Sequence, residues 1–457
     1  MTTVCPNCGR AVSATSVICG NCLQSIHELA VDDGAIERRA AASRRARRNY
    51  YLRRFAVVAF VVVATSAYAW FSWLKPDSLL PVPTSTARTL TSALDQPSRW
   101  ASVGGDNFLH RATSATPKLN APEVWRRTLD ARITTQPVVG DTLVYVGVAS
   151  AGLVALSRDD GREVWRVPVP GQLDAAPTLV GDRLYAVLRD GTIAAFDPQT
   201  GKTIWRSGDG PTFFASPLVS EGVVYAISLG RITALDAENG KTLWIHEIDT
   251  SVSSQAAPVA NHEVLLAASF RRGLVFDRAH GSELFFYALP SPNHLMLAGD
   301  QAMLITEDRV VAFGLDQRRP WWEPFRTGWA ELWLFGMAPA PPDQPRRWVG
   351  PADKGSFAPA LAGDTLVIAT ATGLVRGLDM STGRPRWEQK LGPIAAAPLV
   401  TPTGAVLVQP EGLLLIDPRT GEERGRRAMP GASLRGMGLT SNGMFLISGD
   451  ATVLALR

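Results

Sequence analysis

The stretch that decides the fold reads DPQTGKTIW at residues 197–205. It joins a tight turn, in which Gly201 can adopt the left-handed conformation, to a tryptophan four residues later. The same element returns about every 40 residues, which is the period of a repeat architecture. Close copies read DAENGKTLW at 236–244 and DMSTGRPRW at 379–387, and weaker copies begin at Asp159, Asp277, Asp316 and Asp417.

A second element precedes each of these turns. It reads PTLVGDRLY at 177–185 and PLVSEGVVY at 217–225, and further versions begin at Pro137, Pro258, Pro359 and Pro398 or lie near Leu297 and Met437. Together the two elements provide four short strands and the turns between them, including the hairpin dipeptide Asp190-Gly191. Eight copies of a four-stranded meander predict an all-β fold, an eight-bladed β-propeller over residues 98–457.

The two ends of the repeat region predict how the ring closes. Residues 452–456 (TVLAL) match a third strand without a fourth strand after it, whereas residues 123–125 (EVW) match a fourth strand without a blade before it. We therefore expect the N-terminal strand to complete the last blade, which removes open sheet edges. A linear solenoid would not explain these matching ends.

One spacing departs from the period. Trp322 and Trp387 are 65 residues apart, so about 25 extra residues interrupt the sixth blade. Residues 321–357 contain five of the thirteen tryptophans, and exposed aromatic clusters mark binding sites. We hypothesise that this insertion binds a partner, whereas the alternative is a lid packed onto its own propeller. The residues that would anchor the partner are Trp329, Trp333, Phe335 and Trp348.

The repeats resemble those of the pyrroloquinoline-quinone enzymes and of BamB, the outer-membrane assembly propeller. Residues 100–107 (WASVGGDN) are similar to the lead-in of such domains, so the resemblance covers residues 98–457. For a dehydrogenase the resemblance implies an adjacent cysteine pair over the cofactor, acidic calcium ligands and a catalytic aspartate. All four cysteines of this chain lie in its first 22 residues, so the cysteine pair is missing. We therefore expect no enzyme activity and no pyrroloquinoline-quinone cofactor.

The N-terminal residues 1–27 predict a separate metal-binding unit. Two Cys-x-x-Cys pairs, ten residues apart, comprise Cys5, Cys8, Cys19 and Cys22. Four thiolates in two such knuckles are the ligand set of a structural zinc ion, and Gly9 and Gly20 are placed for the tight turns. The segment resembles the short zinc ribbon of many bacterial membrane proteins; disulfides or free thiols are the alternative. A closed four-cysteine site leaves no position for a catalytic water.

A hydrophobic run predicts a membrane anchor. Residues 55–74 (FAVVAFVVVATSAYAWFSWL) carry no charge and are long enough to cross a bilayer as a helix. Residues 28–54 predict a basic juxtamembrane helix, whose arginines we expect to contact anionic lipid headgroups. The positive-inside rule then places the N-terminus in the cytoplasm and the propeller in the periplasm or outside the cell. Residues 75–97, rich in Pro, Ser and Thr, predict an extended stalk, and a cleaved signal peptide ending near Ala69 is the alternative.

The charge distribution argues against nucleic-acid binding. Residues 1–54 carry a formal charge of +5, so the remaining 403 residues sum to −1 although the whole chain is +4. The sequence therefore predicts a non-enzymatic scaffold at the cytoplasmic membrane, with a propeller that binds envelope or membrane proteins. Two other functions stay open: a transmembrane ligand sensor that signals through the zinc ribbon, and a pyrroloquinoline-quinone-dependent dehydrogenase.

Overall fold

The computed structural model describes residues 2–26, 33–69, 100–102, 104–106, 108–116, 118–169, 172–208, 213, 215–228, 230–248, 256–269, 272–289, 292–315, 326–340, 346–440 and 443–457. The expected stalk at 75–97, the end of the expected membrane segment at 70–74 and the pair Trp321-Trp322 lie outside these residues. The chain divides into two compact units. The first comprises Met1–Pro76 with Trp321–Pro341, and the second comprises Asp77–Pro320 with Pro342–Arg457.

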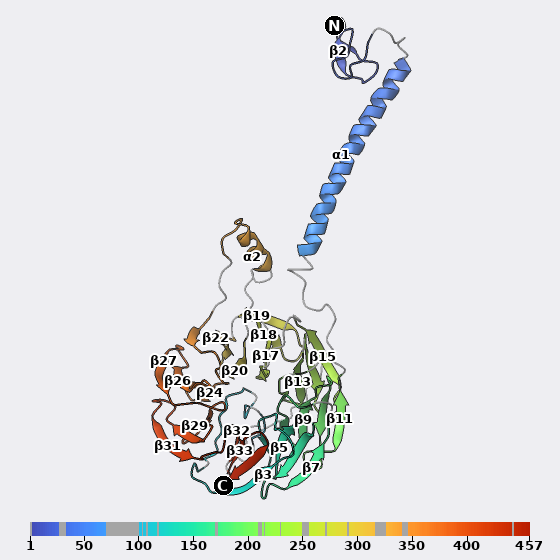
Figure 1. Cartoon of the computed structure of the whole chain (residues 1–457). Helices are drawn as coiled ribbons and strands as arrows, with labels where there is room; N and C mark the ends of the chain where they lie inside the picture. Colours follow the sequence, from blue (N-terminus) through green and yellow to red (C-terminus); the bar gives the residue numbers. More distant parts are fainter. Residues whose placement is uncertain are drawn as a thin grey trace. The chain divides into compact units, whose positions relative to one another are not determined.

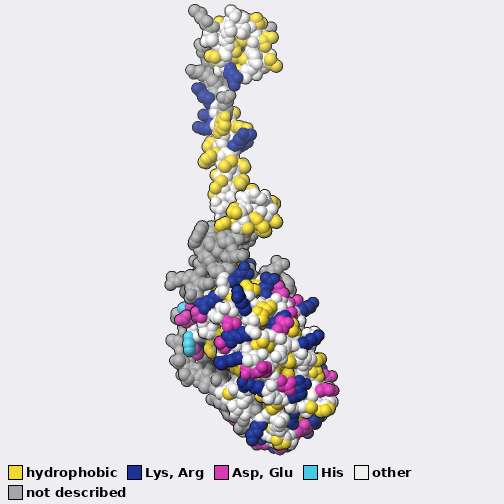
Figure 2. Space-filling view, turned by 90° about the vertical axis from the view of Figure 1, so that its left-hand side faces the viewer, with side chains coloured by type: hydrophobic (Ala, Val, Ile, Leu, Met, Phe, Trp, Pro, Cys, Tyr) yellow, Lys and Arg dark blue, Asp and Glu magenta, His cyan; other side chains and the backbone are white. Residues whose placement is uncertain are grey.

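The first unit contains a hairpin and two helices. Strands β1 (Thr2–Val4) and β2 (Ala11–Ser13) pair antiparallel, and the helices are α1 (Asp33–Ala69) and α2 (Arg326–Leu334). The 37 residues of α1 extend about 55 Å, because an α-helix rises 1.5 Å per residue. The expected basic and apolar segments are thus parts of one continuous helix, with arginines gathered toward its N-terminal half in Figure 2.

The second unit is an eight-bladed propeller in which each blade is a four-stranded antiparallel sheet (Figure 1), so the predicted fold class is confirmed. Blade 1 comprises β4 (Val138–Val139), β5 (Leu143–Val148), β6 (Gly152–Ser157) and β7 (Glu163–Val167). Blade 2 comprises β8 (Thr178–Val180), β9 (Arg183–Val187), β10 (Ile193–Phe196) and β11 (Thr203–Ser207). Blade 3 comprises β12 (Leu218–Ser220), β13 (Val223–Ser228), β14 (Arg231–Asp236) and β15 (Thr242–Glu247). Blade 4 comprises β16 (Val259–Ala260), β17 (Val264–Ser269), β18 (Arg272–Asp277) and β19 (Glu283–Ala288).

The remaining four blades follow the same order. Blade 5 comprises β20 (His294–Ala298), β21 (Gln301–Ile305), β22 (Arg309–Gly314) and β23 (Trp348–Pro351). Blade 6 comprises β24 (Ala360–Ala362), β25 (Thr365–Ala369), β26 (Leu374–Asp379) and β27 (Pro385–Lys390). Blade 7 is β28 (Leu399–Thr401), β29 (Gly404–Gln409), β30 (Gly412–Ile416) and β31 (Glu423–Ala428). Blade 8 is β32 (Leu434–Thr440), β33 (Gly443–Ser448), β34 (Thr452–Leu456) and the N-terminal β3 (Glu123–Thr128).

The ring closes as the sequence predicts. Strand β3 pairs antiparallel with β34, with Trp125 opposite Ala455, and so supplies the fourth strand of the last blade. The chain therefore joins its first and last strands in one sheet, and blade 8 forms only when both are present.

Neighbouring blades are joined by a tryptophan and a glycine. In six of the eight blades a tryptophan of the fourth strand packs under the turn of the next blade, where a Cβ on the glycine would lie 2.5 Å from the ring in the case of Gly240 and Trp205. The indole Nε1 of Trp205 donates a hydrogen bond of 3.1 Å to the Ala237 carbonyl of that turn. The same glycine–tryptophan contact occurs between Gly161 and Trp125, Gly201 and Trp165, Gly281 and Trp244, Gly383 and Trp348, and Gly421 and Trp387.

The insertion lies in the fifth blade, between β22 and β23, and not in the sixth. The tryptophan at the blade position is Trp348, which packs under Gly383, whereas the sequence pattern suggested Trp321-Trp322. The assignment from sequence was wrong because the insertion separates the blade tryptophan from its own turn, so the nearest tryptophan in sequence is not the one in the sheet.

Substituting Gly240 tests the blade junction. Gly240→Ala places a side chain at a φ of 73° and drives a Cβ into the Trp205 ring, so we expect a loss of about 3–4 kcal/mol in the free energy of unfolding. The matched control is Gly181→Ala, which has a φ of 59° but nothing within 4 Å, so it should lose only about 1 kcal/mol. Denaturant unfolding of the full chain measures both, and equal losses would contradict the role of the contact.

Candidate functional site

The four cysteines come from two equivalent knuckles. In the first, Gly9 has a φ of 72° and its N–H donates to the Cys5 carbonyl over 2.9 Å. In the second, Leu23 has a φ of 57° and its N–H donates to the Cys19 carbonyl over 2.8 Å. The left-handed residue is thus the one after the second cysteine in both knuckles. Gly20 lies in the turn of the second knuckle, but Leu23 takes the left-handed position there although it has a side chain.

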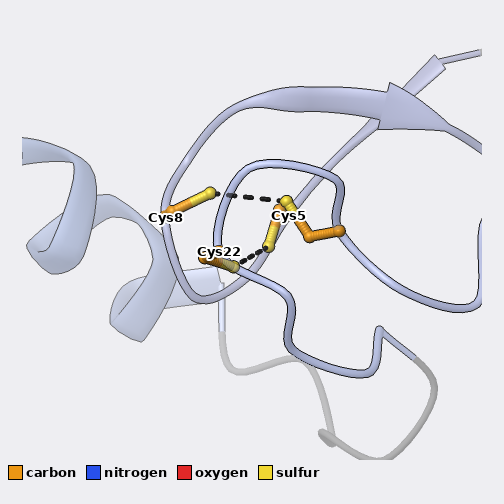
Figure 3. A group of neighbouring side chains, drawn as sticks. Cys5, Cys8 and Cys22 are labelled. Carbon is orange, nitrogen blue, oxygen red and sulfur yellow. Dashed lines mark hydrogen bonds between the residues drawn. The ribbon is translucent and has the colours of Figure 1, made fainter.

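The four sulfurs lie close enough to hold one metal ion. Cys5 and Cys22 Sγ are 3.7 Å apart, Cys8 and Cys19 Sγ are 3.6 Å apart, and the four Sγ atoms lie within 4.8 Å of one another. Figure 3 shows the side chains of Cys5, Cys8 and Cys22 pointing toward one another. A tetrahedral ion with bonds of about 2.3 Å to sulfur places its ligands about 3.8 Å apart, so the cluster fits zinc.

Backbone donors prepare one of these thiols for a metal. The N–H groups of Asn21 and Cys22 lower the pKa of the Cys19 thiol to about 6, since they stabilise the thiolate. Burial raises the pKa of the Cys5 thiol to about 11, and a bound cation would offset that cost. A site that combines a ready thiolate with a buried thiol favours a metal that binds four sulfurs at once.

Helix α1 is long and apolar enough to cross a membrane over Ala41–Ala67. The large apolar side chains along this stretch that the structure describes are exposed, from Phe55 at 73% to Val61 at 51%. Both a membrane anchor and a signal sequence present such a surface.

A cavity of about 360 Å³ occupies the centre of the propeller. Its wall comes from residues at the start of the innermost strands, among them Gln136, Ala176, Ser216, Ala257, His294 and Ala397. Each belongs to a different blade, so the eightfold arrangement of inner strands brings residues together that are far apart in sequence. Most of these positions hold alanine or a hydroxyl residue.

The segment before the first blade crosses this channel and forms the floor of the cavity. The carbonyl of Ala101 accepts a hydrogen bond from Leu179 in blade 2, and the carbonyl of His110 accepts one from Leu361 in blade 6, both shorter than 2.9 Å. Blades 2 and 6 lie on opposite sides of an eight-bladed ring, so the chain between them must cross the axis. Gly104, Leu109 and Arg111 of this segment line the cavity.

Two basic side chains set the electrostatics of the cavity. Arg111 is buried and its Nε donates to the Pro398 carbonyl over 3.0 Å; burial lowers the pKa of its guanidinium to about 10, so it stays charged at neutral pH. Burial lowers the pKa of His294 to about 4, and the charge of Arg111 adds to this effect although the Ser356 carbonyl opposes it. Among the described residues that line the cavity, Asp174 is the one carboxylate.

The structure divides the aromatic residues proposed for partner binding. Trp329, Trp333 and Phe335 lie on or just after α2, where Trp333 is 52% and Phe335 is 73% exposed. Trp348 is 6% exposed in β23, and its Nε1 donates to the Met380 carbonyl over 2.8 Å. The exposed surface also includes Leu334 and Met337 of the run ELWLFGM. The sequence prediction did not include these two residues, because it considered aromatic side chains alone.

Removing two ligands tests the metal centre. We expect the purified full chain to hold about one zinc ion, and Cys8→Ser with Cys22→Ser to hold none, because two thiolates cannot complete the tetrahedron. Elemental analysis measures the zinc content. Asn7→Ala is the matched control, since the Asn7 side chain hydrogen-bonds Gln24 within the ribbon and offers no ligand to the ion. Zinc-free protein with no titratable thiol would indicate disulfides instead.

The histidine in the channel wall predicts an acid-sensitive propeller. The folded state holds His294 neutral down to about pH 4, whereas the unfolded chain protonates it near pH 6.5, so stability is full above pH 6.5 and falls as the pH drops toward 4. We expect a loss of roughly 1–2 kcal/mol between pH 7 and pH 5. His294→Gln should remove this loss in denaturant unfolding, whereas His262→Gln, which changes an exposed side chain, should retain it. The same pH dependence in both variants would contradict the assignment.

Comparison with known proteins adds the family. Solved structures of similar fold include the computationally designed Ika8 protein, which is 14% identical with a TM-score of 0.59 and matches 73% of this chain and 99% of its own. Quinohemoprotein alcohol dehydrogenase from Comamonas testosteroni is 12% identical with a TM-score of 0.59, over 81% of this chain and 83% of its own. BamB from Moraxella catarrhalis is 20% identical with a TM-score of 0.47, over 73% of this chain and 85% of its own.

The likenesses to Ika8 and to the alcohol dehydrogenase concern the fold alone, because both identities are below 25%. A comparison with curated proteins found no match. The family model described as outer membrane protein assembly factor BamB matches residues 118–323 and 326–456, which is most of the propeller. The chain therefore belongs to the propeller family whose model is described as outer membrane protein assembly factor BamB.

Proposed function

We propose that this protein is a non-enzymatic scaffold of the cell envelope, anchored by α1 and docking other envelope proteins on its propeller. The observation that carries the proposal is the family match, which spans every blade and is described by an assembly factor. A scaffold needs a rigid surface and no reactive group, and a closed eight-bladed ring with a charge-balanced surface supplies it.

The lining of the channel supports a scaffold over a dehydrogenase. A quinone cofactor with its calcium ion needs several carboxylates around one point, whereas the described lining offers one carboxylate, Asp174, together with a buried arginine and many alanines. The lead-in segment also occupies the floor of the channel through Leu109 and Arg111. The positive charge of the buried Arg111 opposes the binding of a metal cation in this cavity.

The placement of charge supports an exported propeller. Arginines precede the apolar stretch of α1, and the positive-inside rule would keep that end in the cytoplasm with the metal-binding ribbon. A ribbon of four reduced thiolates fits the reducing cytoplasm, and a propeller without cysteines needs no oxidising compartment to fold. In this proposal zinc has a structural role, and the arginines of α1 contact anionic lipid headgroups.

Affinity purification of the full chain from its native membrane tests the scaffold. We expect envelope proteins in a fixed ratio to the chain, identified by mass spectrometry, and no quinone absorbance in the purified material. A chain ending at residue 99 is the control, because it keeps the ribbon and anchor and lacks the propeller. Partners recovered equally with the control would assign binding to the ribbon or anchor, and a quinone chromophore without a partner would replace the scaffold with a dehydrogenase.

A further inference from the structure

Helix α2 ends in a compact apolar tip that its own backbone holds in place. Gly336 takes a φ of 69°, and the N–H of Met337 donates to the Leu332 carbonyl over 2.8 Å, which is a standard way to end a helix. The Nε1 of Trp329 donates to the Pro339 carbonyl over 2.8 Å and so ties the returning chain to the helix. The tip is therefore a built structure with a defined surface.

The surface of this tip is apolar and exposed. Leu334 is 76%, Phe335 is 73% and Met337 is 67% exposed, and Trp333 beside them is 52% exposed. Between Thr327 and Pro342 the sequence contains one charged residue, Glu331. Such a continuous apolar surface is unfavourable in water, so it needs an apolar environment to cover it.

The chemistry of the tip fits a lipid surface better than a protein surface. Protein interfaces combine an apolar centre with a polar rim whose hydrogen bonds give specificity. From Leu332 to Met337 the tip has no polar side chain apart from the indole of Trp333, and the indole of Trp329 is already bonded within the element. Trp, Leu and Phe side chains that project from a helix are the residues that enter the interfacial region of a bilayer.

The insertion and the tether leave the same face of the propeller. Leu315, just before the insertion, donates its N–H to the Asp300 carbonyl over 2.8 Å, and Arg347 after it forms an ion pair with the Asp300 carboxylate. Asp300 lies in the turn that follows β20, the innermost strand of blade 5. Trp100, where the described chain resumes after α1, pairs with Val139 at the equivalent end of β4, the innermost strand of blade 1. Equivalent ends of innermost strands share one face.

The tether keeps a bilayer within reach of that face. Residues 70–99 connect the last described residue of α1 to Trp100, and 30 residues span at most roughly 100 Å. If α1 crosses the membrane, every propeller stays within that distance of a bilayer, which gives lipid a high local concentration over any dissolved partner. A lipid contact by α2 thus rests on the proposed function in one respect, the membrane anchor α1.

We propose that α2 is a second membrane contact, which inserts Leu334, Phe335 and Met337 into the interface of the bilayer that holds α1. The contact is apolar, so it does not depend on anionic lipid, in contrast to the arginines of α1. The aromatic residues Trp333 and Phe335, first assigned to a protein partner, meet lipid in this proposal.

Site-specific photocrosslinking of the full chain in native membranes tests the proposal. A benzophenone amino acid replaces Phe335 in one variant and Met337 in another, and the matched control replaces Ile204, which is 44% exposed on the outer strand β11. We expect lipid adducts at both α2 positions, on the order of tenfold above the control, as measured by mass spectrometry of the digested protein. Proteoliposomes of pure phosphatidylcholine should give the same adducts, and raised salt should leave their yield unchanged.

Two outcomes would overturn the proposal. A protein adduct of defined mass at Phe335 would assign the tip to a protein partner, and an adduct yield equal to that of Ile204 would leave the tip in water. Alkaline extraction of the same membranes separates this failure from failure of the anchor, since an unanchored chain appears in the soluble fraction. Equal resistance of all variants to trypsin verifies that each one is folded.

Discussion

The contact between a blade tryptophan and the turn glycine of the next blade is the constraint on which the propeller depends. The glycine is required twice, because its φ is positive and because a Cβ would enter the ring, as at Gly240 over Trp205. The same turn offers its carbonyl to the indole Nε1. At six of the eight blade junctions, one copy of the repeat supplies the tryptophan and the next copy supplies the glycine. A repeat built in this way can satisfy all of its junctions only by closing into a ring, which β3 achieves by joining β34.

This constraint explains how much of the fold could be predicted from the sequence. Asp, Gly and Trp recur at a fixed spacing because one local unit makes one local contact, so the blades, their number and the closing strand could all be derived from the pattern. The prediction failed where the contact was supplied from a distance. Trp348 reaches its glycine only after the inserted α2, so its place in the blade could not be recognised from the spacing. A repeat pattern relates residues that are close in the sequence, whereas a blade junction depends on residues that are close in the folded structure.

The candidate sites differ in the same way: some could be predicted from residues close in the sequence, and others form only in the folded structure. The four cysteines lie within 18 residues of one another in the sequence, and their spacing was sufficient to predict a cluster that the structure brings together. The channel could not be predicted, since Arg111 and His294 are far apart in the sequence and meet only because the lead-in segment crosses the axis. Neither residue belongs to a motif. The apolar tip of α2 lies between these cases: its aromatics were visible, but exposure of Leu334 and burial of Trp348 depend on the fold.

The direction of the inner strands relates the channel to the membrane. The wall of the cavity comes from residues that precede the innermost strands, such as Gln136 before β4 and Ala176 before β8, whereas the tether and the α2 insertion join the propeller at the opposite ends of these strands. The lead-in segment closes the channel between the two ends, so the cavity is a cup that opens on the face away from the tether. If that face is turned from the bilayer, the cup is open to solutes and proteins of the surrounding compartment. The cup would then be available to a molecule that approaches from solution, whereas the apolar tip of α2 offers a surface suited to lipid.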